Sequence, residues 1–255
     1  MKHYHQRQRS YCIILSVLSL WCGIAGILKA EPVANAISAY EAGDFAKSAR
    51  EFETALASGP KSAGLYYNLG QALKKQGESG SAALNFRRAL MLDPQLIDAR
   101  ISLSDIERSK GIPLISAGWK DQFIERVPLF PLLVFGFVLF WLGAFLWLIS
   151  AYQRFGNRLA LVSGLVLALV GMTIFTLAYL ADPRLQWRDG AVVVAADGVS
   201  LLSAPAERSP LVAKLPAAAA VRVIRTSGEW VYAKLDDGKS GWLPLNTITD
   251  LVPEK

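Results

Sequence analysis

Cysteine and histidine are almost absent from this sequence. The chain has 255 residues but only two cysteines and two histidines, and all four precede residue 30. The remaining residues therefore offer no Cys–His or Ser–His–Asp nucleophile, no thiol redox pair and no disulfide framework. They also lack the residues that most often bind zinc or haem. We expect neither a metal ion nor another cofactor.

Charged residues are scarce as well. They make up 19% of the chain, whereas hydrophobic residues make up 53% and the mean hydropathy is +0.31. Soluble domains contain about 25% charged residues. The formal net charge of +6 arises largely in the first 30 residues, which hold four basic residues and no acid. Since no basic stripe remains in the rest of the chain, the sequence argues against nucleic-acid binding.

Residues 1–30 have the pattern of a secretory signal peptide. A basic start is followed by an apolar stretch from Tyr11 to Leu28, and Leu28-Lys29-Ala30 predicts cleavage after Ala30. Without cleavage, the same segment would form an anchor with its basic end in the cytoplasm. Both alternatives place the residues after 30 outside the cytoplasm.

Two further apolar runs are long enough to cross a membrane. Val127–Ile149 has 23 residues and Leu159–Leu180 has 22, and about 20 suffice for roughly 30 Å of hydrocarbon. We therefore expect transmembrane helices at residues 127–152 and 159–181. This hairpin would return the chain to the outer side, so that both flanking segments share one compartment.

Small residues recur every seven positions in both apolar runs. A seven-residue spacing keeps them on one helix face, where small side chains permit close approach. The spacing predicts the seam of a tight antiparallel hairpin; alternatively, glycine is simply common in membrane helices. The six residues are Gly136, Gly143, Ser150, Gly164, Gly171 and Ala178.

Residues 32–111 contain an internal repeat. Tyr66-Tyr67-Asn68-Leu69-Gly70 is followed, at fixed spacings, by Gly77, Ala82, Phe86 and Pro94, and a weaker copy with Gly43, Phe52 and Pro60 precedes it. This pattern is similar to the 34-residue tetratricopeptide repeat, a pair of helices. A single helix from Asp98 to Lys110 closes the array.

The resemblance implies a peptide-binding concave face built from the first helix of each repeat. Asn68 and Lys75 are candidates to bind a carboxylate. The alternative is that this helix face is simply exposed to solvent and binds no ligand. The residues expected on this face are Tyr40, Tyr67, Asn68, Gln71, Lys74, Lys75, Ser102 and Asp105.

The array needs support from outside itself. About two and a half repeats are fewer than the three that a stable stack needs. We therefore expect packing against the membrane-proximal segment, self-association or a partner. Residues 112–126 alternate apolar and charged side chains, which predicts an interfacial amphipathic helix.

Residues 190–255 contain short β-rich runs separated by turn residues. Five strands are expected, at 191–195, 211–215, 221–226, 230–235 and 241–243, which favours a small all-β barrel. The runs Val199–Pro205, Gly228–Ala233 and Asp237–Leu243, with their Gly-Trp pair, resemble a bacterial SH3 domain. Such domains bind peptides or cell-wall glycans. Trp230, Tyr232 and Trp242 are then a candidate aromatic ligand surface, or else the two tryptophans mainly pack the barrel.

The fold class expected is thus a multidomain membrane protein. It combines all-α helical repeats, a two-helix transmembrane hairpin and a small all-β SH3-like barrel. The order of these modules resembles the BatE-like proteins of the bacterial Bat aerotolerance cluster. That resemblance implies von Willebrand A-domain membrane proteins and a MoxR-type ATPase as associated proteins, and it supplies no catalytic motif.

Three functions follow from these patterns. The first is a non-enzymatic scaffold in the bacterial inner membrane, with the repeats and the SH3-like domain binding partners on the periplasmic side. The second is a cell-wall sensor, whose SH3-like domain contacts peptidoglycan. The third, an enzyme, would depend on acids or a Ser–Lys pair, and its candidates stand in no supporting motif: Asp182, Asp189, Ser109 and Lys110.

Overall fold

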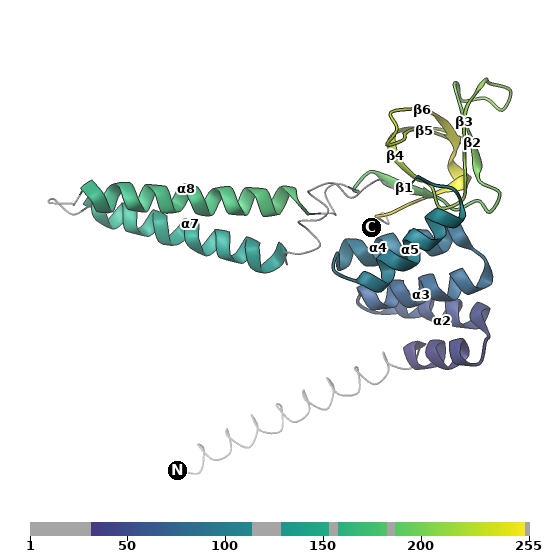
Figure 1. Ribbon diagram of the computed structural model, residues 1–255, viewed down its shortest axis with the longest axis horizontal. Coiled ribbons are helices and arrows are strands. Elements are labelled where there is room, and N and C mark those ends of the chain that lie inside the picture. Colours follow the sequence, from purple (N-terminus) through teal and green to yellow (C-terminus); the bar gives the residue numbers. More distant parts are fainter. Residues whose placement is uncertain (1–31, 114–128, 153–157, 183–186, 253–255) are drawn as a thin grey trace, which may run out of the picture.

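The computed structural model describes residues 32–113, 129–152, 158–182 and 187–252. In it, a long helical hairpin projects from a body in which a helical array and a β-sheet pack together (Figure 1). The expected signal peptide at residues 1–30 lies outside the described residues. The expected interfacial helix at 112–126 does too, apart from its first two residues.

The helical array consists of two helix pairs and one further helix. Residues 32–41 are helical and precede α2 (Phe45–Ser58), α3 (Ala63–Gln76), α4 (Ser79–Leu92) and α5 (Ile97–Ser109). We call residues 32–41, α3 and α5 the inner helices, and α2 and α4 the outer helices. The tight turns inside the repeats need left-handed backbone, which glycine supplies at no steric cost: Gly43 has φ +80° and Gly77 has φ +87°.

Phenylalanines one repeat apart fill the core of the array. Phe52 and Phe86 are at most 1% exposed. A Cβ on Gly70 would lie 2.7 Å from the Phe86 ring, so only glycine lets α3 approach this ring. The repeat spacing seen in the sequence is therefore the spacing of the core contacts.

The hairpin consists of α7 (Leu129–Tyr152) and α8 (Arg158–Leu180). The two helices meet along the predicted small residues, all six of which are buried. A Cβ on Gly143 would lie 2.3 Å from the Ala168 amide nitrogen, and one on Gly171 would lie 2.4 Å from that of Phe140. The hairpin seam predicted from the seven-residue spacing is confirmed.

The C-terminal part forms one antiparallel sheet of seven short strands. These are β1 (Gly190–Val193), β2 (Val199–Leu202), β3 (Leu211–Leu215), β4 (Ala220–Ser227), β5 (Trp230–Lys234), β6 (Ser240–Pro244) and β7 (Ile248–Asp250). Their order is β3-β2-β6-β5-β4-β1-β7. The five expected strands match β1 and β3–β6, whereas β2 and β7 were not expected.

The sheet docks on the outer helix α4. Gly80 permits the approach, since a Cβ there would lie 2.7 Å from the Val193 carbonyl oxygen. Leu84 packs against Val192 and Leu251, and Arg87 donates a 2.9 Å hydrogen bond to the Ala218 carbonyl. The support that the short array was expected to need thus comes from the sheet, an alternative that the sequence did not indicate.

Candidate binding surfaces

The inner-helix face carries the residues expected to bind a peptide. Tyr67 and Gln71 of α3 lie beside Ser102 of α5: Gln71 Nε2 donates hydrogen bonds to Tyr67 Oη at 2.6 Å and to Ser102 Oγ at 3.1 Å. Lys74 pairs with Asp105 at 3.4 Å. These side chains link neighbouring inner helices, so they hold the shape of the face as well as line it.

Other expected residues remain open to solvent on this face. Lys75 is exposed and Asn68 is half-buried, and neither has an ion-pair or hydrogen-bond partner within the described ranges. Tyr40 packs edge-on against Phe45, with ring centroids 5.3 Å apart. Asn68 and Lys75 thus remain the polar groups of this face that are available to a ligand.

Sequence reasoning missed two apolar residues near this face. Ile37 is 44% exposed and Ile101 of α5 is 54% exposed. The repeat period could have predicted Ile101, because it occupies the position in α5 that Tyr67 occupies in α3, 34 residues earlier. The exposed isoleucines of the neighbouring inner helices add apolar area to a set of helices that also carries Asn68 and Lys75.

The outer face of the sheet holds an aromatic cluster. Tyr232 and Trp242 are register partners on β5 and β6, and their ring centroids are 5.2 Å apart. Arg225 of β4 lies over both rings, 5.1 Å from the Trp242 centroid and 5.8 Å from the Tyr232 centroid. Cation–π attraction favours this stacking.

The three expected aromatic residues differ in accessibility. Trp242 is only 8% exposed, whereas Trp230 and Tyr232 are half-buried. The Tyr232 hydroxyl lies 2.9 Å from Ser240 Oγ. Arg225, which the sequence analysis did not predict as a site residue, therefore lies over part of the ring surface that Tyr232 and Trp242 would present to a ligand.

The described residues contain no group of three or more His, Cys, Asp or Glu side chains placed to hold a metal ion.

Arg87 and Glu107 form a largely buried ion pair at 2.7 Å. Burial lowers the pKa of Arg87, and the Glu107 carboxylate opposes that effect. This pair links α4 to α5 and, through the Ala218 carbonyl, to the sheet.

The comparison with protein families identifies the helical array. A tetratricopeptide repeat family model matches residues 33–97. The chain contains tetratricopeptide repeats. No curated protein matches the chain. The matched repeats run from the first inner helix into the start of α5, so they include the whole of the inner helix α3, which carries Tyr67, Asn68, Gln71, Lys74 and Lys75.

Proposed function

We propose that this protein is a non-enzymatic adaptor of the bacterial inner membrane, which binds protein partners through the inner-helix face. The observation that carries the proposal is where the sheet docks. It occupies the outer helix α4, whereas Asn68, Lys75 and Ile101 lie on inner helices. The side of the repeats that binds peptides is thus left open while the array is supported from its other side.

The hairpin supports membrane insertion. The apolar spans Phe130–Tyr152 and Arg158–Leu180 have 23 residues each, and their most apolar stretches have mean hydropathies of 2.6 and 2.3. Only 11% of each stretch is buried, whereas the core helix of a soluble protein would be mostly covered. Large side chains such as Phe135, Leu148 and Leu169 are more than half exposed, and hydrocarbon is the environment that suits them.

The contact between repeats and sheet supports one topology. Arg88 of α4 donates hydrogen bonds to the carbonyl oxygens of Leu251 at 3.0 Å and Asp250 at 2.7 Å. Groups bonded in this way share a compartment, so the chain between them crosses the membrane an even number of times. Two spans satisfy this requirement, and an outside start would put both modules in the periplasm.

The finer assignments rest on the module order and on the shape of the sheet. One core cluster draws residues from all seven strands, and a small SH3-like barrel would have such a core. An SH3-like domain that follows tetratricopeptide repeats and a membrane hairpin is the arrangement that led to the Bat-type resemblance. Von Willebrand A-domain membrane proteins are accordingly the partners we propose.

Site-specific photocrosslinking in cells tests this adaptor function. A photoreactive amino acid at Lys75 or Ile101 is expected to capture A-domain proteins, which mass spectrometry would identify. The matched control is Thr54, an exposed residue of the outer helix α2. Equal capture from Thr54, or recovery of cell-wall fragments alone, would contradict the proposal.

A second candidate function is a cell-wall sensor, favoured by the cluster of Arg225, Tyr232 and Trp242. Aromatic rings beside an exposed cation suit a glycan that carries carboxylates. Sedimentation of the detergent-solubilised full chain with purified peptidoglycan tests it. Loss of cosedimentation in Tyr232→Ala, but not in the inner-face variant Lys75→Ala, would favour the sensor over the adaptor.

A further inference from the structure

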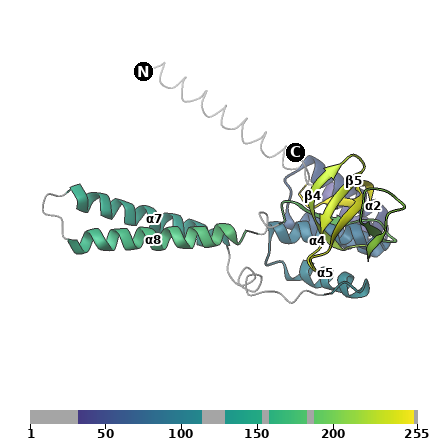
Figure 2. The same cartoon turned by 90° about the horizontal axis from the view of Figure 1, so that it is seen from above.

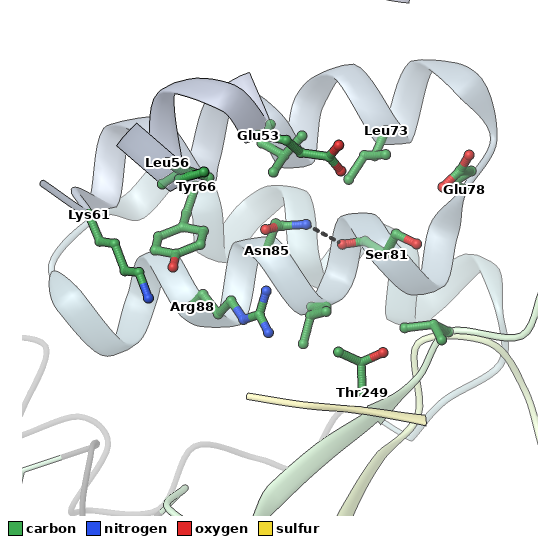
Figure 3. Close-up of a pocket in the computed structure, with 14 residues that line it drawn as sticks. Glu53, Leu56, Lys61, Tyr66, Leu73, Glu78, Ser81, Asn85, Arg88 and Thr249 are labelled. Carbon is green, nitrogen blue, oxygen red and sulfur yellow. Dashed lines mark hydrogen bonds between the residues drawn. The ribbon is translucent and has the colours of Figure 1, made fainter. Parts of the chain in front are cut away.

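A pocket lies at the junction of the repeats and the sheet. It has a volume of about 400 Å³ and is lined by α2, α3, α4 and the edge of the sheet, where Val194 and Thr249 contribute (Figure 3). Small-ligand sites occupy roughly 300–1,000 Å³. The pocket is therefore sized for a small group or a few peptide residues, and it is separate from the inner-helix face.

One wall of the pocket contains a buried polar group that lacks a partner. Asn85 of α4 is 5% exposed, and its Nδ2 donates to the Ser81 carbonyl oxygen at 2.9 Å. Its Oδ1 accepts no hydrogen bond from any described residue. Buried polar atoms in proteins are nearly always hydrogen-bonded, so this oxygen is a candidate to accept a hydrogen bond from an N–H or O–H group of a ligand in the pocket.

Charge is distributed unevenly around Asn85. Figure 3 shows Lys61, Tyr66 and Arg88 on one side of it, and Glu53 and Glu78 on the other. The Arg88 guanidinium lies 5.9 Å from the centroid of the Tyr66 ring. Burial raises the pKa of Tyr66, and the nearby Arg88 only partly offsets this effect. The phenol therefore stays neutral and can donate a hydrogen bond beside the two cations.

Apolar side chains complete the lining. Leu56, Leu69 and Leu84 face the pocket and are at most 9% exposed. A ligand that fits the pocket therefore needs three groups: an anion that binds Lys61 and Arg88, a small hydrogen-bond donor that reaches Asn85, and an apolar group that packs on the leucines. The C-terminal residue of a peptide carries all three: a carboxylate, a backbone N–H and a side chain.

We infer that the junction pocket binds the free C-terminal end of a partner peptide. The carboxylate binds at Lys61, Tyr66 and Arg88, and a backbone N–H donates to Asn85 Oδ1. The terminal apolar side chain packs on the leucines, and a basic residue just upstream is favoured by Glu53 and Glu78. The residues that bind the peptide all belong to the repeats, and Val194 and Thr249 of the sheet close one side of the pocket.

A peptide display library with free C-termini tests this inference. Random heptapeptides are selected on the full chain in detergent, and an enriched peptide is synthesised with a free carboxylate and with a C-terminal amide. We expect enrichment of apolar C-terminal residues and at least a tenfold weaker dissociation constant for the amide. No enrichment, or equal binding of the two forms, would overturn the inference.

Two variants locate the site. Lys61→Glu is expected to weaken binding of the free-carboxylate peptide at least fivefold and to leave the amide unaffected, since Lys61 is exposed and forms no ion pair or hydrogen bond with any described residue. Lys75→Glu, the matched charge reversal on the inner-helix face, is expected to change neither. If Lys75→Glu weakens binding as much as Lys61→Glu does, the peptide occupies the inner-helix face and the inference is wrong.

Asn85→Leu separates a ligand-binding role from a structural one. Leucine removes the buried acceptor, so we expect the thermal midpoint to rise while peptide affinity falls at least tenfold. An asparagine that only supports the fold, or whose oxygen binds an enclosed water, would give the opposite pair of results: a lower midpoint and unchanged affinity.

Discussion

At the residue scale, two ion pairs of similar chemistry differ in their surroundings. The side chains of Arg87 and Glu107 are 11% and 18% exposed, whereas those of Lys74 and Asp105 are 34% and 49% exposed. A buried charge has no water around it, so the loss of its partner strongly lowers stability. At the surface, water solvates the remaining charge, so the loss of a partner costs little. The buried pair therefore supports the array and its contact with the sheet, and the exposed pair contributes little.

Neutralising the acid of each pair should reveal this difference. Glu107→Gln is expected to lower the free energy of unfolding by about 3 kcal/mol, because it leaves the Arg87 charge buried without an opposite charge beside it. Asp105→Asn should cost less than about 1 kcal/mol. Denaturant titration of the full chain in detergent, followed by circular dichroism, measures both. Equal losses would show that burial does not decide the contribution.

At the element scale, the helices α3 and α4 offer a comparison built into the chain. Both have 14 residues, and both carry glycine as their second residue: Gly64 in α3 and Gly80 in α4. A Cβ on Gly64 would meet nothing within 4 Å, whereas one on Gly80 would meet the backbone of Val193 and Val194 at 2.7 Å. The same substitution therefore tests helix propensity at one site and docking at the other.

Gly64→Ala should raise the free energy of unfolding by about 0.5–1 kcal/mol, since alanine favours helix. Gly80→Ala should lower it by about 1–3 kcal/mol through overpacking, and it should also speed amide hydrogen exchange in β1. Hydrogen exchange with mass spectrometry measures the second effect. If Gly80→Ala stabilises the chain as Gly64→Ala does, the sheet does not dock on α4 as described.

The hairpin gives a second prediction at this scale. In Gly143→Val, the new Cβ would lie only 2.3 Å from the backbone of α8. The two helices must therefore separate. Leu165→Val is the control, because Leu165 is 50% exposed and valine is the smaller side chain, so this change adds no atoms between the helices. Spin labels at Phe130→Cys and Leu180→Cys, with Cys12 and Cys22 replaced by serine, should give a narrow distance distribution in the control and a broader, longer one in Gly143→Val. Identical distributions would contradict the glycine contact.

At the scale of the whole molecule, the contact between the repeats and the sheet restricts the topologies that we can propose. The hairpin points away from the repeats and the sheet, and these two modules remain side by side in both views (Figure 2). If the hairpin spans a membrane, as we propose, both modules must lie on the same face of it. The residues between the two spans are then expected on the opposite face.

Single-cysteine labelling tests this arrangement. With Cys12 and Cys22 replaced by serine, Glu53→Cys in the repeats and Lys239→Cys in the sheet should react with an impermeant maleimide added to spheroplasts. Asn157→Cys, between the spans, should react only after the membrane is permeabilised. Labelling of Glu53→Cys and Lys239→Cys from opposite sides would contradict both the topology and the contact made by Arg88.

Much of the fold was predictable because its signals are local or periodic. The tetratricopeptide spacing places Gly70 against Phe86, and the seven-residue spacing places Gly143 against α8. The inner-helix residues were predictable for the same reason. Their mutual pairing was less so, because the bond between Gln71 and Ser102 joins residues 31 positions apart.

The sequence by itself determined the repeats, the apolar hairpin and most of the strands, because each depends on residues that are close along the chain or regularly spaced. Only the tertiary structure decided that the sheet rests on α4. Arg87 and Arg88 reach carbonyl groups 131 to 163 positions away, and Ala218 takes the left-handed φ of +75° that glycine usually provides. Every residue has the same backbone carbonyl group, so the pattern of side chains along the sequence does not indicate which carbonyl an arginine will reach. The pocket between the repeats and the sheet could not be predicted for the same reason.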